Sequence, residues 1–215
     1  MKESAGDIGS KIFDTLKQEL LDLTIKPGEE IVESQVCDRF SVTRPPVRTA
    51  LRRLSDIGLV EIRPYYGNRA TLLDMDKIYQ IITMRSIVES RIITDFIASR
   101  PDGFTLESLE HNIRLQKLMV SDQKMDRTTF FDMDNELHAT WFNAMHCTHM
   151  WSIIQEQKIE YTRYRMLDYK ASMKYKEMGE DHEKIVEAIP LGVRMGIAPS
   201  IGLMLMNIGL GSNVG

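Results

Sequence analysis

The chain has 215 residues, of which 43% are hydrophobic and 27% charged, and its formal net charge is −4. These values are ordinary for a globular chain of one or two domains, and the net negative charge argues against a protein that coats nucleic acid through its overall field. Since no apolar run is long enough to cross a bilayer, no signal peptide is recognisable, and Cys37 and Cys147 suggest no disulfide framework, we expect a cytoplasmic protein with no membrane partner.

Three helices are predicted at the start of the chain. The first covers residues 8–23, where apolar residues recur at helical spacing, and a turn at 26–29 separates it from a short helix over 31–40. Ser41-Val42 is a tight turn into the third helix, which Thr43 can cap and which Gly58 ends. Pro45 and Pro46 fall in the first turn of that helix, where a missing N–H costs no hydrogen bond.

The third helix is the most informative element because it concentrates positive charge. Residues 36–70 contain seven arginines against three acidic residues, a local net charge of +4, and four of these arginines lie on this helix, away from a stripe of Val47, Leu51 and Leu54. Such a patch suffices for phosphate contacts. Taken alone it is also typical of a solvated helix face, but the order of cap, helix, stop and hairpin favours a DNA-reading helix.

A hairpin follows the third helix. Residues 59–63 and 69–73 are strand-like runs around a turn at 64–68. The order helix, helix, turn, helix and hairpin predicts a winged helix-turn-helix DNA-binding domain over residues 1–74. We expect residues 75–215 to form an all-α helical bundle, so the predicted fold class is mainly α.

The second half of the chain is predicted to be entirely helical. The expected helices cover residues 78–97, 106–120, 130–145, 150–166 and 180–189, with Thr105 as the cap of the second. The tail from Pro190 is rich in glycine, although its apolar residues keep helical spacing, so a weakened last helix is expected there.

Ionisable residues interrupt the apolar stripes of three of these helices. Asp134 and His138 lie four residues apart on one otherwise apolar face, His182 heads another stripe, and Arg85 and Glu89 lie within a third. Buried charges must be paired, bind a ligand or coordinate a metal, so one polar cavity inside the bundle is one interpretation. The other interpretation is purely structural, with an Arg85–Glu89 ion pair within one helix and an Asp134–His138 hydrogen bond. The residues alone leave both interpretations open.

Two further features bear on ligands. One Asp and two His are a partial set for zinc or another divalent transition ion, and Arg85 offers a fork for a carboxylate. A second cluster, His146-Cys147 with His149, lies at a predicted helix end, where such residues are commonly capping residues.

These residues fall in the order found in a known family. The first part of the pattern consists of Pro27-Gly28-Glu29, Glu33, Phe40-Ser41-Val42-Thr43-Arg44, Pro46-Val47-Arg48, Ala50-Leu51, Leu54, Gly58-Leu59-Val60 and Gly67. The second part consists of Arg85 and Glu89, Asp134 and His138, and Asp181-His182 followed by Ile185 and Ala188-Ile189. Together they resemble the GntR family of bacterial transcription regulators, in the FadR-type subgroup with an FCD-like all-helical effector domain.

The resemblance implies a homodimer that binds a two-fold-symmetric operator in double-stranded DNA, with residues 75–215 as the effector-binding and dimerisation domain. Arginines of the recognition helix would contact guanines or phosphates, hydroxyl side chains would contact the backbone, and the wing would approach the minor groove. The residues expected at the DNA are Ser34, Thr43, Arg44, Arg48, Arg52, Gly67 and Asn68. Tyr66 stands in the wing where relatives often have a basic residue or His.

The resemblance also implies a small organic acid bound in the helical domain, often beside a metal held by one Asp and three His. Asp134, His138 and His182 match the first three ligands, so zinc or a similar divalent ion is the expected cofactor. The fourth His aligns near Met204, which is a poor zinc ligand, with Asn207 as the nearest polar residue. The residues expected at the carboxylate effector are Arg85, Glu89 and Asn207.

The leading hypothesis is therefore a ligand-responsive transcription regulator, acting as a repressor and not as an enzyme. One alternative is a metal-dependent hydrolase that uses Asp134, His138 and His182 with a bound water. The other is a constitutive DNA-binding repressor whose effector pocket has decayed, which the missing fourth His and the glycine-rich tail motivate.

Overall fold

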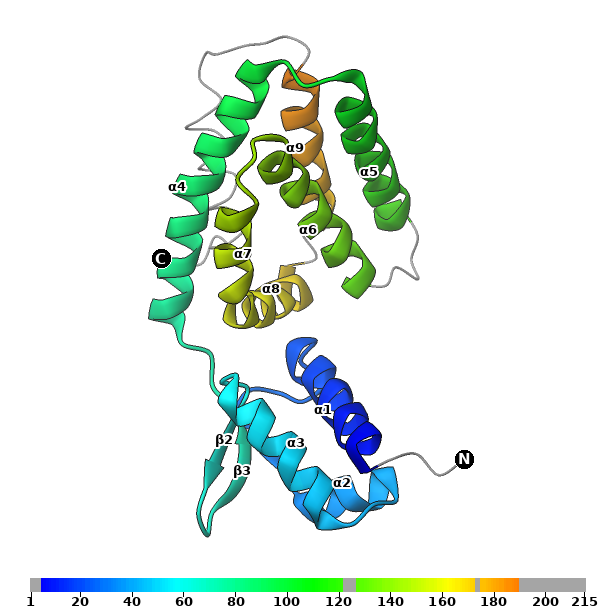
Figure 1. The fold of residues 1–215 in the computed structure, drawn as a ribbon, viewed down its shortest axis with the longest axis vertical. Helices are drawn as coiled ribbons and strands as arrows, with labels where there is room; N and C mark the ends of the chain where they lie inside the picture. Colours follow the sequence, from blue (N-terminus) through cyan, green and yellow to red (C-terminus); the bar gives the residue numbers. More distant parts are fainter. Residues whose placement is uncertain (1–4, 122–126, 173–174, 190–215) are drawn as a thin grey trace. The chain divides into compact units, whose positions relative to one another are not determined.

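The computed structural model of the protein describes residues 5–121, 127–172 and 175–189 (Figure 1). This part of the chain is mainly helical with one small sheet, which confirms the predicted fold class. Its residues form two compact units, one made of residues 5–74 with residues 162–167, and the other of the described residues within 75–161 and 168–189. None of the helices in the described ranges is long and apolar enough to cross a membrane.

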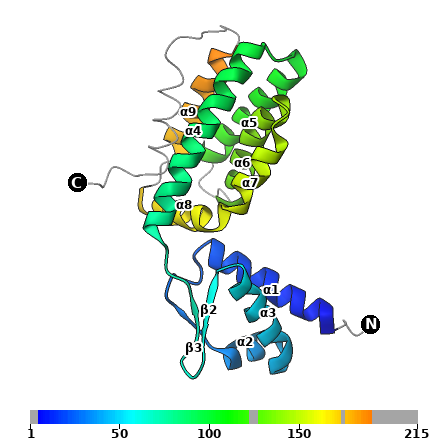
Figure 2. The same ribbon diagram turned by 60° about the vertical axis from the view of Figure 1, so that its left-hand side comes forward.

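The first unit contains three helices and a three-stranded antiparallel sheet in the order β1-β3-β2. Its elements are α1 (Ala5–Leu21), β1 (Glu30–Ile31), α2 (Glu33–Phe40), α3 (Arg44–Asp56), β2 (Val60–Arg63) and β3 (Gly67–Ala70). Helix α3 packs against α1 and against β2, and the β2–β3 hairpin extends beside it (Figure 2). This arrangement is the winged helix-turn-helix that the sequence predicts.

Helix α3 forms where the sequence places its start and stop signals. Pro45 and Pro46 occupy the first turn, and Gly58 takes φ +78° directly after the C-cap residue, Ile57. The buried face of the helix consists of Val47, Ala50, Leu51 and Leu54. The apolar stripe therefore fixes which face of α3 is left to carry the arginines.

Strand β1 was not expected from the sequence. The prediction started a helix at Ile31, whereas Glu30 and Ile31 pair with Arg69 and Asn68 of β3, and α2 begins only at Glu33. Two residues are too few to show the alternation that marks a strand. The short strand is held because the side chain of Ile31 is buried in the first unit.

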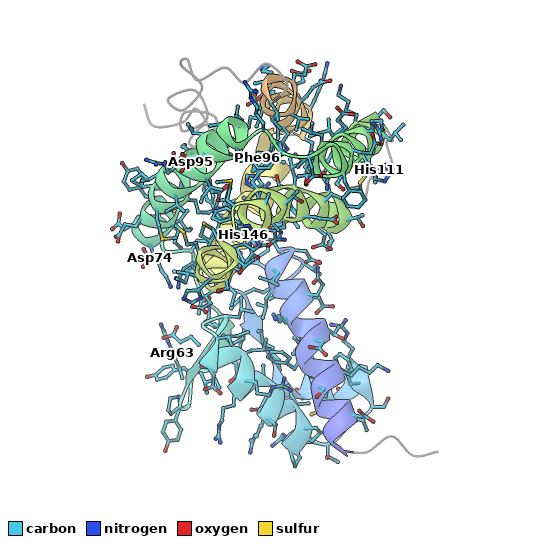
Figure 3. All side chains as sticks on the ribbon, turned by 45° about the horizontal axis from the view of Figure 1, so that its top comes forward. Arg63, Asp74, Asp95, Phe96, His111 and His146 are labelled. Atoms are coloured by element: carbon cyan, nitrogen blue, oxygen red, sulfur yellow. The ribbon has the colours of Figure 1, made fainter. Side chains whose placement is uncertain are left out.

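The second unit is a bundle of helices. They are α4 (Met75–Ser99), α5 (Gly103–Ser121), α6 (Arg127–Ala144), α7 (Thr148–Glu156), α8 (Lys158–Ser172), of which residues 162–167 group with the first unit, and α9 (Tyr175–Ala188). Phe96 from α4, Leu137 and Trp141 from α6 and Ile185 from α9 belong to one apolar core. Figure 3 shows Phe96 among these helices.

All the helix bounds of this unit differ from the prediction, α9 for example starting at Tyr175 and not at residue 180, and two of the differences have a visible cause. The single helix expected over residues 150–166 is two helices, because the backbone breaks at Gln157 (φ −90°, ψ 3°) without a Gly or Pro to signal it. Helix α5 starts at Gly103, and the Asp102 carboxylate accepts a hydrogen bond from the Thr105 backbone N–H at 2.8 Å. The capping residue is therefore Asp102 and not Thr105. The expected last helix, with Met204 and Asn207, lies outside the described residues.

Candidate DNA-binding surface and buried ligand site

The exposed face of α3 carries the arginines expected at DNA. Arg44, Arg48 and Arg52 are all exposed and lie outside the buried stripe of α3. Thr43 occupies the N-cap position, but its side chain makes no capping hydrogen bond and is exposed. Ser34 is exposed in the first turn of α2. The structure thus places these five residues on the surface of the helix-turn-helix.

One of these arginines is held by an acidic residue of the neighbouring helix. Arg48 Nε lies 3.0 Å from Glu33 Oε2, and both side chains remain partly exposed. This contact uses Nε and leaves the two Nη groups of the guanidinium for another partner. Because the residues are 15 positions apart on different helices, sequence spacing gave no sign of the pair.

The residues of the wing differ in whether their side chains are exposed or buried. Gly67 has φ +89°, a conformation that favours glycine, and Tyr65 and Tyr66 beside it are exposed. Arg63, at the end of β2, is also exposed and is marked on the hairpin in Figure 3. Asn68 is buried instead, and its Nδ2 donates a hydrogen bond to the Ile31 carbonyl at 3.4 Å. Its side chain therefore ties β1 to β3 and does not face a partner.

The helical unit brings three buried ionisable residues together in one cluster. Asp134 and His138 of α6 and His182 of α9 each offer one ligand atom, and these atoms all lie within 4.8 Å of one another. Asp134 Oδ1 lies 3.5 Å from His182 Nε2 and 3.8 Å from His138 Nε2. Such separations exceed those of good hydrogen bonds, so this contact is not the structural Asp134–His138 hydrogen bond considered from the sequence.

Glu89 connects this cluster to Arg85. Its Oε1 lies 2.6 Å from Arg85 Nε and its Oε2 lies 2.5 Å from His138 Nδ1, and the carboxylate is fully buried. Burial alone would raise the pKa of Glu89, but the charge of Arg85 and the contact with His138 outweigh it and lower the pKa to about 2. Glu89 is therefore an ionised partner of two neighbours, which makes it a poor contact for an anionic effector.

Aromatic rings enclose the same residues. The His138 ring meets Trp141 edge-on with centroids 4.9 Å apart and lies parallel to Trp151 at 6.3 Å. The Arg85 guanidinium lies 4.3 Å from the centroid of Tyr161. These contacts limit how far the His138 ring and the Arg85 side chain can turn.

The chemistry of the cluster fits a divalent transition ion. One carboxylate and two imidazoles suit zinc and similar ions, and Glu89 beside His138 Nδ1 leaves Nε2 toward Asp134. Among the described residues this is the one group of three or more such ligands close enough to hold a metal. His111, His146 and His149 are exposed and do not belong to it. Figure 3 labels His111 and His146.

Sequence reasoning missed two polar residues next to the cluster. Asn112 and Gln116 of α5 are buried, and Gln116 Oε1 lies 3.1 Å from His182 Nδ1. They interrupt an apolar stripe with Leu109 and Ile113 in the same way as Asp134 and His138 do on α6. The pattern that found those two residues could therefore have found Asn112 and Gln116.

Comparisons with known proteins agree in both halves of the chain. Residues 8–69 match the family described as bacterial regulatory proteins, gntR family, and residues 80–192 match the FCD domain. The chain is 26% identical over 166 residues to the HTH-type transcriptional repressor RspR of Escherichia coli (strain K12), covering 75% of this chain and 70% of RspR. It is 22% identical over 207 residues to the gluconate operon transcriptional repressor of Bacillus licheniformis, covering 95% of this chain and 82% of that protein.

Solved structures show the same fold. That of E. coli McbR/YncC has a TM-score of 0.64 at 14% identity, covering 96% of this chain and 95% of that one. A putative transcriptional regulator GntR from Rhodococcus sp. RHA1 has a TM-score of 0.63 at 17% identity, covering 93% and 92%.

Proposed function

We propose that this chain, which belongs to the GntR family of bacterial regulatory proteins and carries an FCD domain, represses transcription as a homodimer bound to a two-fold-symmetric operator. Its role as a transcription regulator follows from the family, and relatives named as repressors support the direction of control. The observation that carries the proposal is the row of exposed arginines on α3 beside an exposed wing.

The DNA contacts are proposed residue by residue. Arginines of α3 would contact bases or phosphates in the major groove, hydroxyl side chains would contact the backbone, and the wing would follow the neighbouring groove. The proposed set is Ser34, Thr43, Arg44, Arg48, Arg52 and Gly67. Asn68 acts indirectly, because its buried side chain holds β3 against β1.

We assign control of DNA binding to the buried cluster of the helical unit. Asp134, His138 and His182 would hold a divalent ion such as zinc, which when bound supplies a positive charge for an anionic ligand. Arg85 is the proposed contact for a small carboxylate, with Glu89 orienting it. Asn207, also expected at the effector, lies outside the described residues. Occupation of this site would alter how a dimer spaces its two recognition helices.

A hydrolase finds less support in these residues. Metal-dependent hydrolysis needs a general base near the bound water. Both oxygens of Glu89 are taken up by Arg85 and His138, and a pKa of about 2 makes this carboxylate a weak base. The arrangement therefore favours binding over turnover.

Operator affinity measured with and without candidate effectors tests the control. Full-length protein would be titrated against its selected operator by fluorescence anisotropy, with zinc present, in a panel of small mono-, di- and hydroxycarboxylates. We expect one acid class to change the affinity by roughly 5–150-fold, the usual range of allosteric coupling. Arg85→Lys, which keeps the charge but loses the fork, should weaken that response. An affinity that no acid changes would favour the constitutive repressor.

A further inference from the structure

We propose that Asn112 and Gln116 of α5 fix the tautomer of His182 and thereby direct its Nε2 lone pair toward Asp134. The proposal rests on the metal site proposed above but concerns residues outside the sequence pattern that identified that site. We call the series of hydrogen bonds from the Met133 carbonyl through Asn112 and Gln116 to His182 the amide relay. It joins α5, α6 and α9.

The amide relay starts at the Met133 backbone carbonyl, which can only accept a hydrogen bond. Asn112 Nδ2 lies 3.0 Å from the backbone carbonyl oxygen of Met133 on α6. A carbonyl oxygen only accepts hydrogen bonds, so the amino group of Asn112 must face it. The Oδ1 atom of Asn112 then faces Gln116.

The second amide passes this orientation on. Gln116 Nε2 donates to Asn112 Oδ1 at 2.7 Å, and the two residues are four apart on α5. The amino group of Gln116 is thus committed to Asn112, which leaves its Oε1 3.1 Å from His182 Nδ1. Because Oε1 only accepts, the proton of this hydrogen bond must be on His182 Nδ1.

The tautomer of neutral His182 follows from this proton. A neutral imidazole has one N–H, so a proton on Nδ1 leaves a lone pair on Nε2, which lies 3.5 Å from Asp134 Oδ1. On the other histidine, Glu89 Oε2 lies 2.5 Å from His138 Nδ1, and this close carboxylate favours a proton on that nitrogen. Asp134 Oδ1 and the Nε2 atoms of the two histidines therefore point at one another as acceptors, which is the arrangement that a bound cation needs of its ligands.

Burial makes the orientation of both amides firm. Gln116 is fully buried and Asn112 nearly so. Turning either amide by 180° would bring donors against donors or acceptors against acceptors, and such unsatisfied buried groups are costly away from water. Partners that hold the second nitrogen of a ligating His fix its tautomer and orientation. Asn112 and Gln116 are accordingly positioning residues and not ligands.

The tautomer can be read directly in the metal-free protein. Long-range ¹H–¹⁵N correlation spectra of full-length protein with ¹⁵N-labelled histidine, recorded with a chelator above the pKa of free histidine, distinguish the two neutral forms. We expect His182 to carry its proton on Nδ1. Asn112→Ala should release the Gln116 amide and give a mixture of tautomers, whereas Gln116→Glu should keep the Nδ1 proton. A proton on Nε2 in the wild type, or an unchanged tautomer in Asn112→Ala, would overturn the relay.

Metal affinity gives a second readout. Co²⁺ or Zn²⁺ affinity, measured by competition with a chelator, should fall about 10–100-fold in Gln116→Leu, the usual effect of losing an outer-shell partner. It should stay near the wild-type value in Gln116→Glu and in the control Gln80→Leu, a matched change at an exposed position of α4. Equal affinity in a folded Gln116→Leu variant would contradict the relay, as would a loss in the control. If the wild type bound neither ion, the metal site would fail while the tautomer measurement still decided the relay.

Discussion

Individual side chains were predictable by type and position, but not by partner. Asp134, His138 and His182 stood out in the sequence because each interrupts an apolar stripe, and the structure brings their ligand atoms within 4.8 Å of one another. The contact of Glu89 with His138 joins residues 49 positions apart, so no helical spacing could indicate it. For the same reason the sequence could not show that Asn68 turns inward.

Arg48 is the residue on which the DNA-binding proposal depends most. If it contacts a guanine, Arg48→Ala should cost about 1–3 kcal/mol of specific binding free energy and reduce discrimination at one operator position. The matched control is Arg53→Ala on the same helix, because the Arg53 guanidinium lies 3.9 Å from the Phe13 ring centroid and not at the proposed DNA face. Anisotropy titrations with the operator measure both. Equal losses in the two variants would speak for a general charge effect.

Glu89 makes stability depend on pH in a predictable direction. Its pKa falls from 4.5 to about 2 on folding, so its ionised form stabilises the folded chain above pH 4.5, and this contribution is lost as the pH falls toward 2. Glu89→Gln, which removes the charge opposite Arg85, should lower the free energy of unfolding at neutral pH by about 3–5 kcal/mol. The difference from wild type should shrink below pH 4.5.

Denaturant unfolding with a chelator present, at several pH values, checks this. Asp95→Asn is the control, because Asp95 forms the same i,i+4 pair with Arg91 on α4 but in an exposed position (Figure 3). Its effect should stay below about 1 kcal/mol. A Glu89→Gln variant no less stable than this control would refute the buried role of the pair.

At the scale of elements, the prediction succeeded where Pro or Gly residues mark the start or end of an element. Helix α3 begins and ends at its Pro and Gly signals, as expected, and a hairpin follows. The second strand of this hairpin is Gly67–Ala70 and not residues 69–73, so Gly67 and Asn68 belong to the strand and not to the turn. The break between α7 and α8 at Gln157 carries no such signal, and β1 is only two residues long. Both features depend on packing within the fold, which local sequence does not encode.

Gly67 tests the wing as an element. A side chain at φ +89° is strained, so Gly67→Ala should destabilise the protein by about 1–2 kcal/mol and weaken operator binding by distorting the hairpin. Gly9→Ala is the matched control, since Gly9 lies inside α1 and its added Cβ would meet nothing within 4 Å. This change should stabilise by about 0.5–1 kcal/mol. Thermal unfolding of both variants is the measurement, and a neutral Gly67→Ala would argue against a constrained wing.

At the scale of the whole molecule, the two units differ in where they place their charges. The chain is acidic overall, yet residues 36–70 have a local charge of +4, which confines DNA affinity to one small module. The helical unit holds Arg85, Glu89 and the Asp134, His138 and His182 cluster buried, where a bound ligand would change the balance of their charges. The family matches support this division, with the gntR match in the first half and the FCD match in the second.

Selection of bound DNA from a random double-stranded pool tests the central proposal most directly. With the wild-type protein we expect a short inverted repeat whose half-sites lie about one helical turn apart, 10–10.5 base pairs, and we expect Arg48→Ala to lose the enrichment while Arg53→Ala keeps it. A pool that yields no enriched sequence, or one whose enrichment is the same with Arg48→Ala, would contradict sequence-specific regulation by this chain.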